Sequence, residues 1–210
     1  MQLTSPFLIL FALAVGYLLG RYRASSFQNR GEDLVSSEIQ AKLSSPDFHL
    51  LNHITLKLKD GTTQVDHILV SRFGVFVIET KDYNGWIFAN GKHATWTQVL
   101  YRVKFKFQNP IFQNLRHVRA VEELLEFLPP EAIKSAVVFT GSAEFKTDMP
   151  SGVYTLSGLI DHLKSSTEEV MSLNRVQFCV GRLETARLAI TGQTDLEHVK
   201  SLQRKHGGPR

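Results

Sequence analysis

The chain from Gln64 to Lys81 reads QVDHILVSRFGVFVIETK, and this stretch predicts two β-strands joined by a tight turn at Ser71–Gly74. The runs on either side of the turn are rich in Val, Ile and Phe, as in strands of a buried sheet. Asp66, Glu79 and Lys81 interrupt this apolar pattern. Charged side chains are rarely buried without partners, so these three residues are the first candidates for a functional site.

Strand geometry allows the three charged residues to meet. Residues i and i+2 of a strand share a face, so Glu79 and Lys81 project side by side. The turn makes the two strands antiparallel neighbours, so Asp66 can approach that pair. Two carboxylates can hold a hard divalent cation through oxygen ligands, with waters completing its shell. Such a cation activates water and stabilises charge that develops on a phosphodiester, and a lysine can orient that water or stabilise the transition state.

Two further residues are candidates for the same site. Glu32, at the start of the first predicted helix, could supply a third carboxylate, and Gln113, on a later helix, could orient substrate or a metal-bound water. The alternative is structural, because a Glu-x-Lys pair on a strand is usually an ion pair on a solvated edge. The apolar setting and the partner Asp66 favour the functional interpretation.

Four short motifs carry a family resemblance in order along the chain: Gly31-Glu32, Gln64-Val65-Asp66, the strand from Gly74 to Lys81, and Asn109-Pro110-Ile111-Phe112-Gln113. Together they resemble the nuclease-related domain (NERD), a family similar to the PD-(D/E)xK nuclease superfamily. The resemblance covers about Gly31 to Leu128. Gln64-Val65 stands where the superfamily has proline before the aspartate, a departure that the related domain tolerates.

The resemblance implies an α/β fold with a restriction-endonuclease-like core, in which helices flank a central mixed β-sheet. It implies that Asp66 and Glu79 bind Mg²⁺ or Mn²⁺ and that Lys81 is the catalytic lysine. Glu32 carries over as an accessory metal ligand and Gln113 as an accessory catalytic residue. The expected partner is nucleic acid, with DNA favoured over RNA.

Composition sets few limits on function. The chain has 210 residues, 43% hydrophobic and 21% charged, which is normal for a globular protein. Its net charge of +4 is compatible with an acidic polymer or an anionic lipid surface and proves neither. Cys179 is the one cysteine, so an intrachain disulfide is impossible.

Hydrophobic spacing and turn signals predict the remaining elements. Asn84-Gly85 predicts a β-hairpin between its flanking strands, and Pro129-Pro130 ends a helix. The expected elements are a helix from Gly31 through Leu43; strands His49–Leu58, Thr62–Val70, Gly74–Lys81 and Trp86–Phe88; one or two strands within Trp96–Phe107; a helix from Asn109 through Leu125; strands Ala136–Thr140 and Val153–Leu156; and helices Leu159–Leu163, Leu173–Ile190 and Asp195–Gln203.

The N-terminal segment predicts a membrane anchor. Residues 3–22 are largely apolar, which is long enough for a short transmembrane helix, and Arg21 and Arg23 lie at its C-terminal end. The positive-inside rule then places the C-terminal domain in the cytoplasm, on a single-pass protein of the cell inner membrane. A cleaved signal peptide in front of a periplasmic domain fits less well because no basic residue precedes the apolar run. A buried core helix is the third alternative.

The domain boundaries follow from these assignments. We expect a transmembrane helix at 3–22, a linker at 23–30, a nuclease-related core at 31–128, a C-terminal α/β extension packed on the core at 129–204, and a disordered tail at 205–210.

Several other residues have less decisive patterns. His67 points away from Asp66 on the same strand and is expected to be structural or to support the site, whereas His49, His53, His93 and His117 are expected at the surface or in loops. Trp86 and Trp96 are expected in the core or at its rim in preference to the alternative, that they are platforms on which bases stack. The run from Tyr101 to Phe107 alternates, which puts Arg102, Lys104 and Lys106 on one face; this face is either an ordinary solvated surface or a stripe that contacts phosphates.

The leading hypothesis is therefore a membrane-anchored, nuclease-like enzyme that hydrolyses phosphodiester bonds with a divalent metal ion. The alternative is a catalytically inactive module of the same fold that binds nucleic acid or a protein partner at the membrane, because a fold does not guarantee an activity.

Overall fold

The structure, a computed structural model, describes residues 15–16, 30–43, 46–59 and 61–187. Most of the predicted transmembrane helix at 3–22, nearly all of the linker at 23–30, the helix Asp195–Gln203 and the tail at 205–210 lie outside these residues. Within the described ranges, no helix combines the length and the apolar character that a membrane crossing requires.

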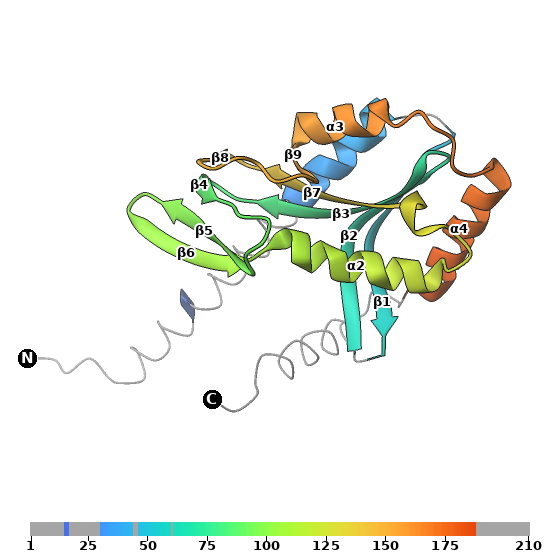
Figure 1. Cartoon of the computed structure of the whole chain (residues 1–210), viewed down its shortest axis with the longest axis horizontal. Coiled ribbons are helices and arrows are strands. Elements are labelled where there is room, and N and C mark those ends of the chain that lie inside the picture. Colours follow the sequence, from blue (N-terminus) through green and yellow to red (C-terminus); the bar gives the residue numbers. More distant parts are fainter. Residues whose placement is uncertain (1–14, 17–29, 44–45, 60, 188–210) are drawn as a thin grey trace, which may run out of the picture.

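A five-stranded mixed sheet forms the centre of the molecule (Figure 1), in the order β1-β2-β3-β7-β9. Strands β1, β2 and β3 are antiparallel, whereas β3, β7 and β9 run parallel to one another. The predicted mixed sheet is thus confirmed. The strand bounds are His49–Leu58 for β1, Gly61–Ser71 for β2, Gly74–Asp82 for β3, Ile133–Thr140 for β7 and Val153–Thr155 for β9.

Helices cover both faces of this sheet, as an α/β fold requires. Residues 30–42 form a helix that packs on one face together with α3 (Leu156–Ser165), while α2 (Pro110–Leu124) and α4 (Leu173–Ala186) pack on the other. Alternate residues of β3 separate the two cores: Val75 and Val77 face α2 and α4, and Phe76 and Ile78 face the opposite helices. A short 3₁₀ helix, Pro130–Ala132, precedes β7.

A second sheet, not expected from the sequence, has the order β6-β5-β4-β8. Its strands are β4 (Gly85–Phe88), β5 (Thr95–Leu100), β6 (Val103–Gln108) and β8 (Ala143–Phe145). The predicted hairpin at Asn84-Gly85 is wrong because β2 and β7 already occupy both edges of β3, so β4 pairs with β5 and β8 instead. The Asn84 side chain accepts a hydrogen bond from the Ser142 backbone N–H at 3.0 Å, where the chain enters β8.

The segment assigned to a C-terminal extension contributes directly to the central sheet. Strand β7 lies between β3 and β9, and Glu79 and Lys81 of β3 lie opposite Val137 and Phe139 of β7. The strand beside the candidate site therefore comes from beyond residue 128.

Candidate active site

Helix α2 is anchored so that its first turns lie against β3. Asn109 caps the helix by accepting from the Ile111 backbone N–H at 2.9 Å, and Pro110 occupies the first turn, as the Asn-Pro signal predicts. The fully buried Asn114 side chain donates to the carbonyl oxygens of Val77 and Ala136, at 2.9 and 3.1 Å. These bonds tie α2 to both β3 and β7 and hold its side chains over the end of β3.

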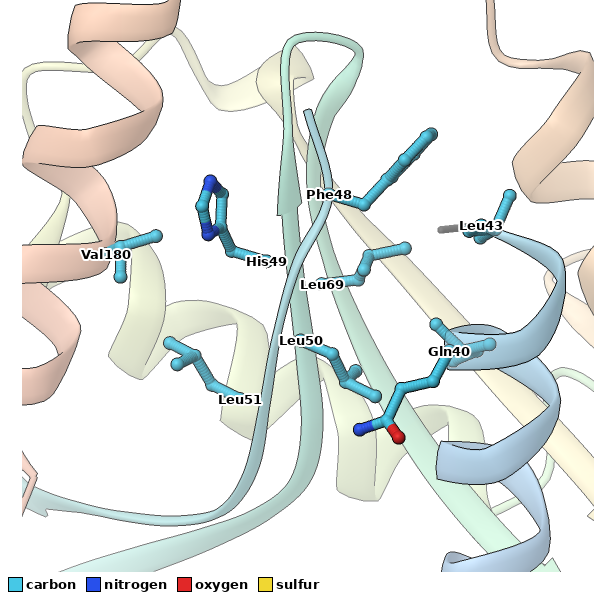
Figure 2. A pocket seen from close by; sticks show the side chains of 9 residues that line it. Gln40, Leu43, Phe48, His49, Leu50, Leu51, Leu69 and Val180 are labelled. Carbon is cyan, nitrogen blue, oxygen red and sulfur yellow. The ribbon is translucent and has the colours of Figure 1, made fainter. Parts of the chain in front are cut away.

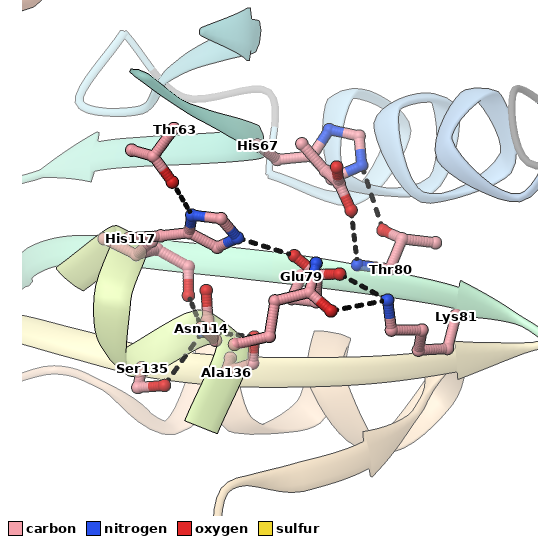
Figure 3. A network of polar contacts seen from close by, with 12 residues as sticks. Thr63, His67, Glu79, Thr80, Lys81, Asn114, His117, Ser135 and Ala136 are labelled. Atoms are coloured by element: carbon pink, nitrogen blue, oxygen red, sulfur yellow. Dashed lines mark hydrogen bonds and ion pairs between the residues drawn. The ribbon is translucent and has the colours of Figure 1, made fainter. Parts of the chain in front are cut away.

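Three of the predicted residues are in direct contact. The Lys81 ammonium donates to Glu79 Oε1 at 2.6 Å (Figure 3). It also donates to Gln113 Oε1 at 3.1 Å. Glu79 is 2% exposed, so this is a buried ion pair and not a pair on a solvated strand edge. Asp66 lies on the neighbouring strand, where its Oδ2 accepts from the Thr80 backbone N–H at 2.7 Å.

His117 is a site residue that the sequence did not reveal. The prediction that it lies at the surface or in a loop is wrong: it is buried, with Nε2 3.1 Å from Glu79 Oε2 and Nδ1 2.7 Å from Thr63 Oγ1. It lies one helical turn after Gln113, so both side chains reach the same edge of β3. The i, i+4 spacing of Gln113 and His117 is the signal that could have identified it.

Glu32 lies at the start of the helix at 30–42, buried, with Oε2 3.1 Å from Nδ1 of His53. The surface prediction for His53 is therefore incomplete, because its half-exposed ring also contacts a candidate site residue. Gly31 allows the start of this helix to pack closely against Asp82 and Thr140, at the ends of β3 and β7. A Cβ at residue 31 would lie 2.7 Å from Asp82 Cβ and 2.8 Å from Thr140 Oγ1, so the helix could not pack so closely with a larger residue.

The acidic residues destabilise one another as anions. Burial, followed by the nearby Glu79 and Glu32 carboxylates, raises the pKa of Asp66 well above its usual value. Burial also raises the pKa of Glu32, and Glu79 adds to the effect despite the opposing His53. Glu79 thus contributes to the raised pKa of both Asp66 and Glu32, and Glu32 contributes to that of Asp66.

Glu79 and Lys81 show the opposite behaviour. Burial opposes ionisation of Glu79, but His117 and Lys81 outweigh it and lower the pKa of this carboxyl. Burial likewise opposes the charged form of Lys81, and Glu79 outweighs it and raises the pKa of the amine. Lys81 is therefore an ammonium at neutral pH, able to donate hydrogen bonds but unable to accept a proton.

The fit of a divalent metal ion can be judged from these donors. Among the described residues, no group of three or more His, Cys, Asp or Glu side chains has an arrangement suited to a metal ion. Mg²⁺, however, is commonly held by one or two carboxylates and several waters. Asp66 and Glu79 supply such a pair of buried carboxylates, and Glu79 Oε2 lies 3.1 Å from His117 Nε2. The donor set fits a hydrated Mg²⁺ ion with two protein ligands.

His67 stabilises the strands on the side away from Glu79. Its ring contacts Asn52 Oδ1 through Nδ1 at 2.8 Å and Thr80 Oγ1 through Nε2 at 3.2 Å, so its structural assignment holds. Burial lowers the pKa of His67 to about 4, and His53 adds to this effect.

This shift predicts a pH dependence of stability. A histidine whose folded-state pKa is lowered stabilises the fold above its ordinary pKa of 6.5, and this contribution is lost as the pH falls toward about 4. In EDTA, the free energy of unfolding of wild type should fall by about 3 kcal/mol more over this interval than that of His67→Gln. Urea unfolding at a series of pH values measures it, with the exposed His93→Gln as the control. Parallel pH profiles for wild type and His67→Gln would contradict the assignment.

An apolar groove lies apart from this cluster. It has a volume of about 410 Å³ and runs along β1 between the helix at 30–42 and α4. Figure 2 shows Leu50 and Leu51 pointing to opposite sides of β1, with Gln40 and His49 as the polar side chains of the lining. The groove contains no carboxylate, so the candidate chemistry belongs to the end of β3.

A mixed α/β sheet with buried acids and a lysine at the end of one strand defines a class of nuclease-like α/β domains. Comparison with known families places the chain within that class. Residues 28–140 match the nuclease-related domain (NERD) model, and the chain belongs to this family. The match includes Glu32, Asp66, Glu79, Lys81 and Gln113.

A relative is found among curated proteins. An uncharacterized protein of Bacillus anthracis is 45% identical over 97 residues, which cover 46% of this chain and 45% of the relative. The chain thus spans less than half the length of that relative.

Proposed function

We propose that this protein hydrolyses phosphodiester bonds of nucleic acid with the help of a divalent metal ion. Membership of the nuclease-related family supports a nuclease-like function. The observation that carries the proposal is the buried Glu79–Lys81 pair, 2.6 Å apart, next to an Asp66 whose pKa is raised by burial and by Glu79. A divalent cation would relieve the repulsion among these acids, which gives the cluster a chemical purpose.

Asp66 and Glu79 would hold Mg²⁺ or Mn²⁺, and Glu32, whose carboxylate contacts His53, would be an accessory ligand. When bound, the ion supplies an activated water and neutralises charge on the phosphate. Lys81, as an ammonium, would donate to the scissile phosphate or to the attacking water and stabilise the developing negative charge. Gln113 would keep Lys81 in place, and His117 would fix the Glu79 carboxylate.

The second candidate is a nucleic-acid-binding module without turnover. The contacts of Glu79 Oε1 with Lys81 and of Glu79 Oε2 with His117 favour it, because both oxygens of this carboxylate already have protein partners. The two candidates differ in one property, because only the first cleaves its ligand.

The test is cleavage by the full-length chain of single-stranded and duplex DNA and RNA in Mg²⁺, Mn²⁺ or EDTA. We expect cleavage with either metal and none in EDTA, and a loss of about 10²-fold or more in Glu79→Gln. Glu123→Gln, an exposed residue on α2, is the matched control and should keep the wild-type rate. Cleavage that persists in Glu79→Gln would refute the assigned site, and binding without cleavage in every condition would favour the second candidate.

The location of the domain is a separate proposal. The apolar segment at 3–22, followed by Arg21 and Arg23, supports a single-pass anchor in the cell inner membrane with the nuclease-related domain on the cytoplasmic side. Protease added to spheroplasts should leave the domain intact, and protease added to inverted vesicles should degrade it. The reverse pattern would contradict this orientation.

A further inference from the structure

The second sheet has one face that packs on the protein and one that is open. Cross-strand pairs place Trp86, Val99 and Lys104 in one row and Phe88, Thr97 and Lys106 in the next. Directly paired residues share a face of the sheet, so these two rows form one surface, which we call the open face. The rows lie two residues apart along each strand, about 7 Å.

Exposure confirms that this face is turned to solvent. Trp86 is 48% and Phe88 is 40% exposed, whereas Ile87, between them, is fully buried. Lys104 and Lys106 are also exposed, and Trp96 of the other face is buried in the core with Phe139. Trp86 is predicted in the core or at its rim, but its ring lies on the solvent-exposed face of the second sheet.

Most of the open face lies in a basic segment of the chain that has no acidic residue. From Tyr83 to Val121 there is no Asp or Glu. The whole chain has 24 Lys and Arg and 20 Asp and Glu; without the basic residues of this segment the remainder has 18 against 20, a net charge of −2. The basic excess thus resides in this segment: Lys92, Arg102, Lys104, Lys106, Arg116 and Arg119.

One further cation contacts the open face. The Lys146 ammonium lies 4.8 Å from the centre of the Trp86 ring and also pairs with Glu144, which faces Trp86 across the sheet. Exposed ion pairs contribute little stability, so this pair can open at small cost. An aromatic ligand that stacks on Trp86 would displace the Lys146 ammonium from the ring. The ammonium would then lie close enough to pair with an anionic group of the same ligand.

We propose that the open face binds single-stranded nucleic acid, with bases stacked on Trp86 and Phe88 and phosphates on Lys104, Lys106 and Lys146. Exposed rings flanked by cations are the means by which sheet surfaces bind unpaired strands. A duplex would present phosphates to the lysines but keep its bases away from the rings. The choice of nucleic acid as the ligand rests on the proposed function. The inference itself concerns binding and not cleavage.

The position of the second sheet suits this role. Strand β6 ends at Gln108 and leads directly into α2, which carries Gln113 (Figure 1). Phe107 of β6 packs edge-on against Tyr83 at 4.8 Å, two residues after Lys81 on the chain. The second sheet therefore adjoins the end of β3, where the candidate catalytic residues lie.

The test is fluorescence anisotropy of the full-length chain in EDTA, which prevents metal-dependent cleavage. The probes are labelled oligothymidylate of about 15 nucleotides, the same length of oligouridylate, and a duplex of the first with oligoadenylate. We expect either single strand to bind at least tenfold more tightly than the duplex, and the tighter of the two identifies DNA or RNA as the preferred strand.

Variants assign the binding to the open face. Trp86→Ala should weaken single-strand binding by about 5- to 150-fold, whereas Trp86→Phe keeps a stacking ring and most of the affinity. The double variant Lys104→Gln, Lys106→Gln should lower the slope of log affinity against log salt by about 1.4, and the exposed pair Lys57→Gln, Lys164→Gln should leave it unchanged. Thermal unfolding of each variant verifies folding.

Duplex binding as tight as single-strand binding, or an unchanged affinity in folded Trp86→Ala, would overturn the inference. Its failure is distinguishable from failure of the proposed function. If the protein binds single strands but does not cleave them in Mg²⁺, the inference is supported and the proposed nuclease activity is refuted. If a folded Trp86→Ala protein cleaves nucleic acid and binds single strands with unchanged affinity, the proposed activity is supported and the inference is refuted.

Discussion

Replacing Lys81 by methionine should reduce metal-dependent cleavage by about 10²- to 10⁴-fold while the protein still binds the metal ion. The Lys81 ammonium contacts both Glu79 and Gln113, and its raised pKa keeps it charged. Methionine fills similar space but cannot stabilise negative charge. Because its removal also frees Glu79 Oε1, affinity for Mg²⁺ should be unchanged or higher.

Single-turnover cleavage and calorimetric titration of Mg²⁺ into the same protein measure the two effects separately. Lys57→Met, on the exposed edge of β1, is the matched control and should change neither. Loss of metal binding together with cleavage would mean that Lys81 supports the fold of the site instead of the chemistry. Full activity would refute its assignment.

Replacing Asp66 by asparagine should abolish cleavage and at the same time stabilise the metal-free fold. Burial and the neighbouring Glu79 and Glu32 raise the pKa of Asp66, so ionising this carboxyl opposes folding. A raised carboxyl pKa gives stability that is complete below the ordinary value of 3.8 and is lost as the pH rises through the folded-state value. At neutral pH the asparagine should therefore raise stability by about 1 kcal/mol or more, or 2–4 °C in Tm per kcal/mol.

The Thr80 backbone N–H can still donate to the side-chain carbonyl oxygen of the introduced asparagine, so the strand contact survives. Thermal unfolding in EDTA and in Mg²⁺ measures the effect. Wild type should gain Tm on adding Mg²⁺ and Asp66→Asn should not, and the advantage of the variant in EDTA should disappear as the pH approaches 3.8. The exposed Asp161→Asn on α3 is the control. A lower Tm for Asp66→Asn in EDTA would contradict the proposed repulsion.

The central pair of strands was predictable from sequence because its signals are local. Apolar runs, a tight turn and period-two alternation are enough to place β2 and β3 and to put Glu79 beside Lys81. The cap at Asn109-Pro110 is equally local, and it places Gln113 in the second turn of α2.

What could not be predicted depends on contacts between distant segments. The second sheet needs β8, three residues long, to pair with β4 over more than 50 positions of sequence, and no local pattern announces such a pairing. His117 lies one helical turn after Gln113 in sequence, but only the packing of α2 on β2 and β3 brings it to Thr63 and Glu79. Burial of Glu32 depends likewise on the close approach that Gly31 allows.

The central claim is that Asp66 and Glu79 form one divalent-metal site beside Lys81. Calorimetric titration of Mn²⁺ into the full-length chain, at neutral pH, tests this most directly. One ion should bind per chain in wild type, with binding lost in Glu79→Gln and in Asp66→Asn and retained in Lys81→Met. Equal binding by wild type and both carboxylate variants, or no binding by wild type, would contradict the claim.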